Sequence, residues 1–260
     1  MKHNLFFLAG GLILSGIAVA QQPVTQQTSA QPASPQSADP CASLKEDQQA
    51  MQSKLSDWPD LAKYRDEDTK LAPPAKGKPR VVFLGDSMTE FWPLSESFPS
   101  KPYVNRGISG QTTPQILLRF RQDVIALQAK VVVILAGTND IAENTGPTSL
   151  AAIEDNLMSM TDLARKNGIH VVLSSVLPAS SYPWRPEIQP VEKIHALNDW
   201  MKEYAAKEGW VFLDYYPVMA NDKLGLKAEL SEDGVHPNKA GYAVMASLAE
   251  KAILQALGKD

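Results

Sequence analysis

Short runs of consecutive apolar residues, rich in valine, isoleucine and leucine, constrain the fold of this chain more than any other feature. The runs are 81–84, 131–135, 171–176 and 210–213, with 103–105 as a shorter candidate. Runs without polar alternation are typical of strands buried on both faces of a parallel sheet. Stretches with helical spacing lie between and after them, at 113–127, 148–167, 191–208 and 237 to about 257. This alternation predicts a doubly wound, flavodoxin-like α/β domain, a three-layer sandwich with a parallel sheet of about five strands.

The first eighty residues divide into three segments that differ in composition from the main domain at 80–260. Residues 1–20 hold a basic start, an apolar run and a final Ala-Val-Ala, which is typical of a signal peptide cleaved after Ala20. Residues 21–40 are mostly Gln, Pro, Ser and Ala, and such a composition predicts a disordered tether. Residues 41–79 predict a helical extension, a pair of helices interrupted by a proline, laid on the main domain.

The N-terminal apolar run has one alternative interpretation, an uncleaved membrane anchor. The run is short for a membrane span, which needs about 20 apolar residues, and it ends in small residues. We therefore expect a periplasmic or secreted protein that is not stably inserted in a membrane. The formal net charge is −4 and no basic stripe is present, so a nucleic-acid partner is not expected. The single cysteine, Cys41, cannot form an internal disulfide.

A serine follows the first apolar run in the segment VVFLGDS, where the predicted strand ends. Functional residues of doubly wound domains gather beyond the carboxyl ends of the strands, so Ser87 is a candidate nucleophile. An alcohol reacts at neutral pH only with a base within hydrogen-bond reach. Gly-Asp-Ser also forms ordinary turns, and the segment lacks the Gly-x-Ser-x-Gly elbow of other serine hydrolases. Catalysis by Ser87 therefore depends on a histidine elsewhere in the chain.

Four histidines are candidates for that base. His3 leaves with the predicted signal peptide, His170 begins a strand at the opposite end of the sheet, and His195 lies within a helix. His236 lies in the loop DGVHPN, three residues after Asp233. An aspartate can accept from one imidazole nitrogen while the other nitrogen serves the serine. The alternative is that Asp233 is a turn residue and that His236 precedes the last helix without a catalytic role.

Acyl transfer also requires hydrogen-bond donors aimed at the oxyanion. Gly110 lies in a turn after the second strand, where the absence of a side chain lets its N–H approach a ligand. Asn139 follows the 131–135 strand, and its amide would point into the same crevice. Glycine and asparagine are also common turn formers, which is the alternative for both residues. Two such turns at the carboxyl ends of strands favour the catalytic interpretation.

Together these segments resemble the SGNH, or GDSL-type, hydrolase superfamily over about residues 80–257. The four matching blocks are VVFLGDSMTE, NRGISGQTT, LAGTNDIAENTG and DGVHPNKAGY. The second and third blocks are most similar to the platelet-activating-factor acetylhydrolase-like esterase branch. The resemblance implies that Ser87 is the nucleophile, that Asp233 and His236 complete the triad, and that the Ser87 N–H, Gly110 and Asn139 form the oxyanion hole. Met88 replaces the leucine of the GDSL motif.

The substrate is less constrained than the chemistry. Trp92 and Trp184 are candidate substrate-binding residues, suited to a sugar face or an apolar acyl chain, and packing roles are the alternative. Glu90 and Glu143 near the crevice would disfavour anionic substrates. No metal or cofactor is expected. The sequence thus predicts an exported serine esterase that hydrolyses short-chain esters, acetyl esters above all, of a small molecule or a carbohydrate.

Two alternatives remain open. One is a lysophospholipase, or another lipid or thioester acylhydrolase, with a long acyl channel. The other is a non-catalytic carbohydrate- or lipid-binding module that has kept the fold. The second is disfavoured because a decayed enzyme would be expected to have lost at least one catalytic residue, and none is missing from the four blocks.

Overall fold

The structure, a computed structural model, describes residues 40–258. The chain divides into two compact units, Met1–Glu46 and Asp47–Asp260, and the second contains all the described strands. The predicted signal peptide and nearly all of the predicted tether lie outside the described residues, as does the Cys41 side chain. Within residues 40–258, no helix combines the length and the apolar character that crossing a membrane requires.

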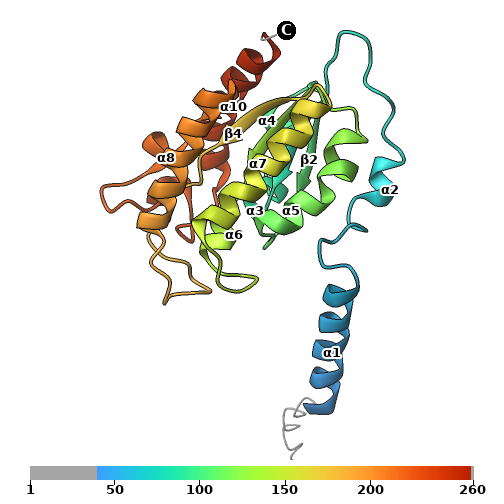
Figure 1. Cartoon of the computed structure of the whole chain (residues 1–260). Coiled ribbons are helices and arrows are strands. Elements are labelled where there is room, and N and C mark those ends of the chain that lie inside the picture. Colours follow the sequence, from blue (N-terminus) through green and yellow to red (C-terminus); the bar gives the residue numbers. More distant parts are fainter. Residues whose placement is uncertain (1–39, 259–260) are drawn as a thin grey trace, which may run out of the picture. The chain divides into compact units, whose positions relative to one another are not determined.

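Five parallel strands form one sheet in the order β2-β1-β3-β4-β5 (Figure 1). The strands are β1 (Val81–Gly85), β2 (Tyr103–Gly107), β3 (Val131–Leu135), β4 (His170–Ser174) and β5 (Val211–Leu213). Every residue of β1 and β3 is buried, as continuous apolar runs predict. The predicted flavodoxin-like doubly wound fold is confirmed.

The strand order reverses at β1, because the chain runs from β1 to the edge strand β2 and then crosses back to β3. Gly85 at the end of β1 pairs with Gly107 of β2 and with Leu135 of β3, so the three carboxyl ends are level. In open parallel sheets, ligands bind in the crevice outside the carboxyl ends at such a reversal. The topology therefore places the segments after β1, β2 and β3 around one crevice.

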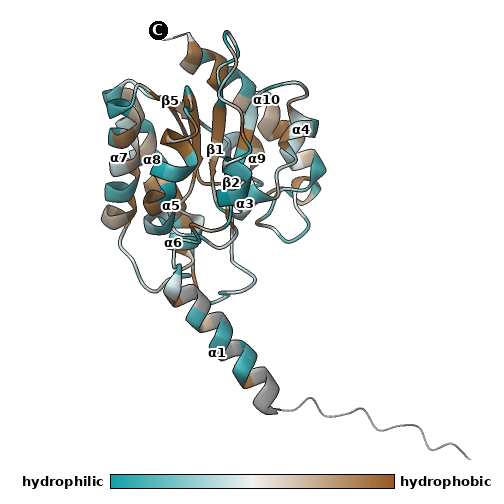
Figure 2. Ribbon diagram, turned by 90° about the vertical axis from the view of Figure 1, so that its right-hand side faces the viewer, coloured by the Kyte–Doolittle hydropathy of each residue, from teal (hydrophilic) through white to brown (hydrophobic). Residues whose placement is uncertain are grey.

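Helices cover both faces of the sheet (Figure 2). The helices α5, α7 and α8 lie on one face, and α4 and α10 lie on the other. Their bounds are α4 (Leu94–Ser97), α5 (Thr113–Phe120), α7 (Leu150–Lys166), α8 (Val191–Glu208) and α10 (Lys239–Leu257). Four further short helical elements follow strands or precede α10: α3 (Ser87–Glu90), α6 (Thr138–Ile141), α9 (Tyr216–Met219) and η2 (Ala228–Leu230). The helix predicted over 113–127 continues beyond α5 as a π-helical turn, Arg121–Ile125.

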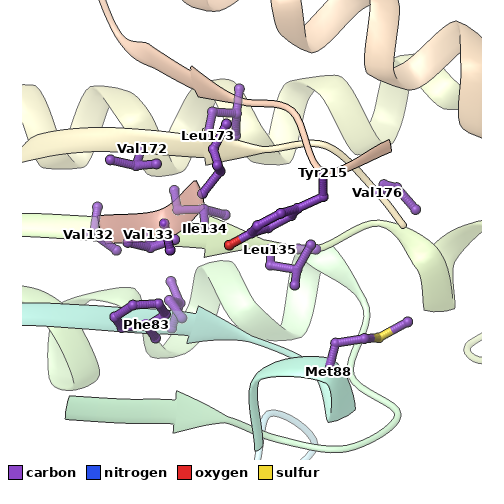
Figure 3. Packing of buried hydrophobic residues seen from close by; sticks show 14 of the residues in the cluster. Phe83, Met88, Val132, Val133, Ile134, Leu135, Val172, Leu173, Val176 and Tyr215 are labelled. Atoms are coloured by element: carbon purple, nitrogen blue, oxygen red, sulfur yellow. The ribbon is translucent and has the colours of Figure 1, made fainter. Parts of the chain in front are cut away.

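The core lies between the sheet and its two helical layers. Figure 3 shows side chains of β3, among them Val132 and Ile134, between Phe83 of β1 and Leu173 of β4. All four of these side chains are essentially inaccessible to solvent. Close packing of this kind makes the strands a rigid platform, which fixes the positions of the loops that follow them.

One predicted boundary is wrong, for a local reason. The strand predicted to reach Val176 ends at Ser174, because the Asn198 side chain of α8 binds both the N–H and the carbonyl of Val176, at 2.7 and 3.0 Å. In the N-terminal extension, turns that include Pro59 separate a long helix, α1 (Pro40–Ser56), from the four-residue α2 (Arg65–Asp68). Asp57 ends the helical path because its carboxylate accepts from the N–H groups of residues 61 and 62.

Candidate active site

The predicted nucleophile lies at the first turn of α3, directly after β1. Ser87 is buried, with 3% of its surface exposed, and its Oγ lies 2.9 Å from Nε2 of His236. Asp86 caps α3, because its carboxylate Oδ1 accepts from the Met88 N–H at 3.0 Å. The end of a rigid strand and a capped turn therefore hold the hydroxyl in place. A neutral His236 can accept its proton at this distance.

The predicted base is oriented by its own loop. His236 Nδ1 lies 2.7 Å from Oδ2 of Asp233, and Oδ1 of Asp233 accepts from the N–H groups of Val235 and His236 at 2.9 and 2.8 Å. Partial burial would raise the pKa of Asp233, but these hydrogen bonds outweigh it and lower the pKa to about 2. The carboxylate is therefore ionised at neutral pH and holds the imidazole with Nε2 facing Ser87. The structure brings these three predicted residues together.

Two other carboxyl groups lie on the buried side of the site. Burial raises the pKa of Asp86 to about 7, and the neighbouring Asp140 adds to this effect. Burial also raises the pKa of Asp140 to about 6, although the N–H and hydroxyl of Thr113 both donate to it. These contacts join the segment after β3 to the start of α5. Burial thus shifts both carboxyl groups toward the neutral form, Asp86 more than Asp140, which limits negative charge behind Ser87.

The two predicted oxyanion donors follow β2 and β3: Gly110 lies in the loop after β2, and Asn139 lies in the short helix α6 after β3. Gly110 has a φ of +77°, a conformation that glycine adopts without strain. Asn139 is buried, and its Nδ2 donates to the Gln111 carbonyl at 3.0 Å. An amide carries two Nδ2 hydrogens, so a second one can serve an oxyanion. The structure holds both residues at the same edge of the sheet, on the segments that follow β2 and β3.

Asn144, which sequence reasoning missed, connects these two segments. Its Nδ2 donates to Oδ1 of Asn139 at 2.8 Å and approaches the Gly110 carbonyl at 3.4 Å. The bond to Oδ1 fixes which end of the Asn139 amide carries the donor. Asn144 lies inside the third sequence block, but its spacing from Asn139 has no turn or helix periodicity that would identify it.

The two glutamates predicted near the crevice, Glu90 and Glu143, both bind cationic side chains, and Glu90 also binds the loop after β2. Glu90 Oε2 accepts from the Ser109 N–H at 2.6 Å, while Oε1 pairs with Lys63 Nζ at 2.6 Å. Glu143 pairs with cations at 3.6 Å, Arg185 and Lys193. Both glutamates thus face cationic partners, so they are poor candidates for repelling anionic substrates, contrary to expectation.

A buried arginine, Arg119, also supports the loop after β2. Arg119 of α5 donates to the carbonyl of Gly85 at 2.7 Å, to the carbonyl of Arg106 at 2.7 Å and to Gln111 Oε1 at 2.6 Å. Burial lowers its pKa, and an ion pair with Asp123 at 2.7 Å opposes this effect. The only sequence signal was a charged residue inside the apolar segment ILLRF.

The structure separates the two tryptophans predicted at the substrate site. Trp92 is a core residue, 3% exposed, and its ring packs against Phe83, Phe98 and Tyr242. It therefore does not reach the crevice. Trp184 is 40% exposed, and its ring centroid lies 6.0 Å from that of His236.

Trp184 is also held in place. Its ring stacks on Tyr182 at 5.2 Å, and its Nε1 donates to Asn144 Oδ1 at 3.0 Å. The structure thus keeps one of the two predicted aromatic residues beside the serine–histidine pair.

A doubly wound sheet with serine, histidine and aspartate hydrogen-bonded in series at its carboxyl edge is an arrangement suited to ester hydrolysis. The sequence model of the GDSL-like lipase/acylhydrolase family matches residues 83–244, and the chain belongs to this family. It is a carboxylic ester hydrolase. The resemblance drawn from the four sequence blocks is confirmed.

The chain is similar to known proteins at different levels. A GDSL-like lipase from Bacteroides thetaiotaomicron is 44% identical, with a TM-score of 0.73, over 76% of this chain and 98% of that chain. An acetylxylan esterase from Geobacillus stearothermophilus, 21% identical with a TM-score of 0.54 over 70% of this chain and 95% of that chain, shares the fold. The uncharacterized lipoprotein YqeF of Bacillus subtilis is 37% identical over 78 residues. That match covers 29% of this chain and about a third, 32%, of YqeF.

Proposed function

We propose that this protein is an exported serine esterase that removes short acyl groups, acetyl above all, from a carbohydrate ester. The observation that carries the proposal is the hydrogen-bonded series Ser87 Oγ, His236 and Asp233, with contacts of 2.9 and 2.7 Å. Membership of a family of lipases and acylhydrolases supports ester chemistry. The shared fold of an acetylxylan esterase makes an acetylated carbohydrate a reasonable substrate class.

In the first half-reaction, Ser87 Oγ attacks the ester carbonyl carbon while His236 Nε2 takes the hydroxyl proton. Asp233, ionised because its pKa is lowered to about 2, stabilises the imidazolium that forms. The N–H groups of Ser87 and Gly110 and the Asn139 amide bind the oxyanion. The tetrahedral intermediate collapses, the C–O bond to the alcohol breaks, and His236 gives its proton to the departing alcohol. An acyl-serine remains.

In the second half-reaction, water attacks the acyl-serine carbonyl and His236 takes a proton from that water. The same donors bind the second oxyanion. The bond between the carbonyl carbon and Ser87 Oγ then breaks, and the serine recovers its proton from His236. The products are a carboxylic acid and the free enzyme, so no external oxidant or reductant is involved.

A longer-chain lipid acylhydrolase is a second candidate, favoured by a groove near His236. This Phe91 groove has a volume of about 740 Å³ and is lined by Phe91, Pro93, Glu96, Ser97, Pro237, Asn238, Lys239, Tyr242, Ala243 and Ala246. The Phe91 ring lies 5.8 Å from the His236 ring. We rank this candidate second because two charged side chains, Glu96 and Lys239, line the groove, and an alkyl chain gains nothing from charged walls.

Export is part of the proposal. The first twenty residues have the composition of a signal peptide. The partial match to a protein named a lipoprotein adds support for an extracytoplasmic location. Mass spectrometry of the protein recovered from cells tests it, because cleavage after Ala20 leaves Gln21 as the first residue. A mature protein that keeps its first twenty residues would contradict export by cleavage.

Replacing the nucleophile has the largest expected effect on activity. Ser87→Ala should lower the rate of p-nitrophenyl acetate hydrolysis by about a thousand-fold or more, because no acyl-enzyme can form. A fluorophosphonate probe should label the wild-type protein at Ser87 and leave the variant unlabelled. Ser159→Ala, on the exposed surface of α7, is the matched control and should behave as wild type. Near-wild-type hydrolysis by folded Ser87→Ala would remove the assignment.

The acyl preference is tested separately, with p-nitrophenyl esters from acetate to palmitate. A maximum of kcat/KM at two to four carbons agrees with the proposal. A maximum at eight carbons or more would replace it with the lipid acylhydrolase, whose chain would then occupy the Phe91 groove.

A further inference from the structure

A second groove, with lining residues different from those of the Phe91 groove, opens beside the site. This Trp58 groove has a volume of about 840 Å³ and is lined by Asp57, Trp58, Asp60, Ala62, Ile108, Ser109, Gly110, Gln111, Gln115, Asn144, Thr145 and Trp184. It includes Gly110, a proposed oxyanion donor, and Trp184, which lies beside His236. Its volume falls within the range of about 300–1,000 Å³ that is typical of small-molecule sites. A ligand in this groove would therefore lie next to the reacting ester.

One wall of the groove comes from the turn at 57–62, which precedes the first strand and lies outside the family match at 83–244. Three glutamine side chains hold this turn through its backbone carbonyls. Gln115 donates to Trp58 O at 2.8 Å, Gln111 to Pro59 O at 2.7 Å, and Gln122 to Leu61 O at 2.8 Å.

The turn is also closed on itself, because the Asp57 carboxylate accepts from the N–H groups of residues 61 and 62, each at 2.9 Å. These contacts fix its backbone independently of the Trp58 side chain. A substitution of that side chain should therefore leave the turn in place.

Although its backbone is anchored, Trp58 leaves 42% of its surface exposed to solvent. Trp184 is 40% exposed and is anchored through Tyr182 and Asn144. Leaving large apolar rings in water is unfavourable, and a fixed ring loses little conformational entropy when it binds a ligand. Two exposed indoles in one groove, Trp184 with an anchored ring and Trp58 on an anchored backbone, are therefore suited to a ligand with apolar faces. The C–H faces of a pyranose ring provide such a surface.

The polar lining of the groove points to the same class of ligand. Of its described lining residues none is lysine or arginine, whereas Asp57 and Asp60 are acidic, so an anionic ligand is disfavoured. The Ser109 hydroxyl can both donate and accept, and Gln115 Nε2 carries a second hydrogen besides the one that binds Trp58 O, so sugar hydroxyl groups can bind both. A quaternary ammonium group would suit the indoles and carboxylates but could accept no hydrogen bond from these groups. The lining as a whole fits a neutral sugar best.

We propose that the Trp58 groove is a sugar-binding subsite in which Trp58 and Trp184 contact pyranose faces and direct an acetyl ester toward Ser87. The inference rests on the proposed esterase function and deepens it, because it assigns carbohydrate specificity to a segment outside the family match. Trp58 is thus a specificity-determining residue, whereas the bond-breaking chemistry belongs to Ser87 and His236.

Binding can be measured without catalysis in the full-length Ser87→Ala protein, with unsubstituted xylotetraose and cellotetraose as probes in isothermal titration calorimetry. Adding Trp58→Ala should weaken binding of the better probe by about tenfold or more, while Trp58→Phe should recover most of it because an aromatic face remains. Leu254→Ala, which removes an exposed apolar side chain from α10, is the control and should not change the affinity.

Activity gives the second readout. In proteins with Ser87 intact, Trp58→Ala should raise KM for acetylated xylo-oligosaccharides and lower the ratio of their kcat/KM to that of p-nitrophenyl acetate by about tenfold. Equal losses on both substrates would contradict a sugar subsite and indicate a general effect on the site. Unchanged tetrasaccharide affinity in folded Trp58→Ala would overturn the proposal, as would Trp58-dependent binding of choline with no binding of either sugar.

The outcomes also separate this inference from the esterase function. If Ser87-dependent hydrolysis is present but no sugar binds the Ser87→Ala protein, the subsite is wrong and the esterase stands. If tetrasaccharide binding depends on Trp58 but wild-type protein shows no Ser87-dependent hydrolysis of any acyl ester, the subsite stands and the esterase function is wrong.

Discussion

The two sides of Ser87 are built in different ways. On the protein side, Asp86, Asn139 and Asp140 are at most 3% exposed, and burial raises the pKa of Asp86 to about 7. On the solvent side, the side chains of Asp233 and His236 are 43% and 26% exposed, and hydrogen bonds lower the pKa of Asp233 to about 2. The surroundings thus favour the neutral carboxyl group of Asp86 on the protein side and the ionised carboxylate of Asp233 on the solvent side.

The difference indicates how each side keeps its geometry. The buried side depends on the sheet, because the strand ends and the loops after them are fixed by packing and by groups such as Arg119. The exposed side depends on a single carboxylate, whose two oxygens bind the His236 ring and two backbone N–H groups. We therefore expect substitutions on the buried side to affect oxyanion binding or stability, and substitutions of Asp233 to affect the base.

Asn139→Ala, on the buried side, should lower kcat more than Asp233→Asn, on the exposed side. If the amide donates to the oxyanion, the bond strengthens as charge develops, so kcat should fall by about a hundred- to a thousand-fold with KM nearly unchanged. Ser87 should still react with a fluorophosphonate, only more slowly, because nucleophile and base remain. Asn139 also binds Gln111 and Asn144, so the melting temperature must be measured with kcat. A normal kcat with a lowered melting temperature would reduce Asn139 to a loop-bracing residue.

On the exposed side, Asp233→Asn should lower kcat by roughly ten- to a few-hundred-fold, because the imidazole tautomer and the imidazolium both lose support. The expected loss is smaller than the roughly ten-thousand-fold of the serine-protease example in which the aspartate is buried, since water reaches the Asp233 side chain. Oδ1 of an asparagine can still accept from the N–H groups of Val235 and His236, so the fold should persist.

The measurement is kcat for p-nitrophenyl acetate between pH 6 and 9, with circular dichroism to verify folding. Full activity of Asp233→Asn would mean that another group orients His236. The exposed side would then not depend on the Asp233 carboxylate.

The buried side and the fold were the more predictable parts of the molecule, for a physical reason. Continuous apolar runs specify strands buried on both faces, and parallel strands bring their carboxyl ends to one edge wherever they lie in the chain. Ser87, Gly110 and Asn139 could therefore be grouped from their places after three runs. The contact between His236 and Asp233 could also be predicted, because the two residues are only three positions apart in the sequence.

Contacts between distant, irregular segments could not be predicted. Trp92 was expected at the site because it follows the nucleophile closely, but Tyr242 from α10 and Phe83 from β1 enclose it in the core. Conversely, the turn that carries Trp58 is placed by glutamine side chains more than fifty residues later in the chain. No local pattern reports contacts that exist only after the sheet and its helices have assembled.

The smallest expected effect concerns Asp86, on the buried side of Ser87, and is an effect on stability. Its pKa in the folded protein, about 7, lies above the unfolded value near 3.8 because of burial, so the folded state holds its proton more tightly. The stability that Asp86 contributes is therefore fully present below about pH 4 and is lost as the pH rises through 7. Asp86→Asn keeps an oxygen for the Met88 N–H and cannot ionise.

The free energy of unfolding in urea, measured at pH 5 and pH 8, tests this expectation. The wild type should lose on the order of 1–2 kcal/mol more than Asp86→Asn over this interval. Some loss should remain in the variant because burial raises the pKa of Asp140 in the same direction, to about 6. Asp155→Asn, an exposed position on α7, is the control and should follow the wild type. If Asp86→Asn and wild type lose the same stability, then Asp86 is ionised in the folded protein at pH 5, and burial does not distinguish the two sides of Ser87.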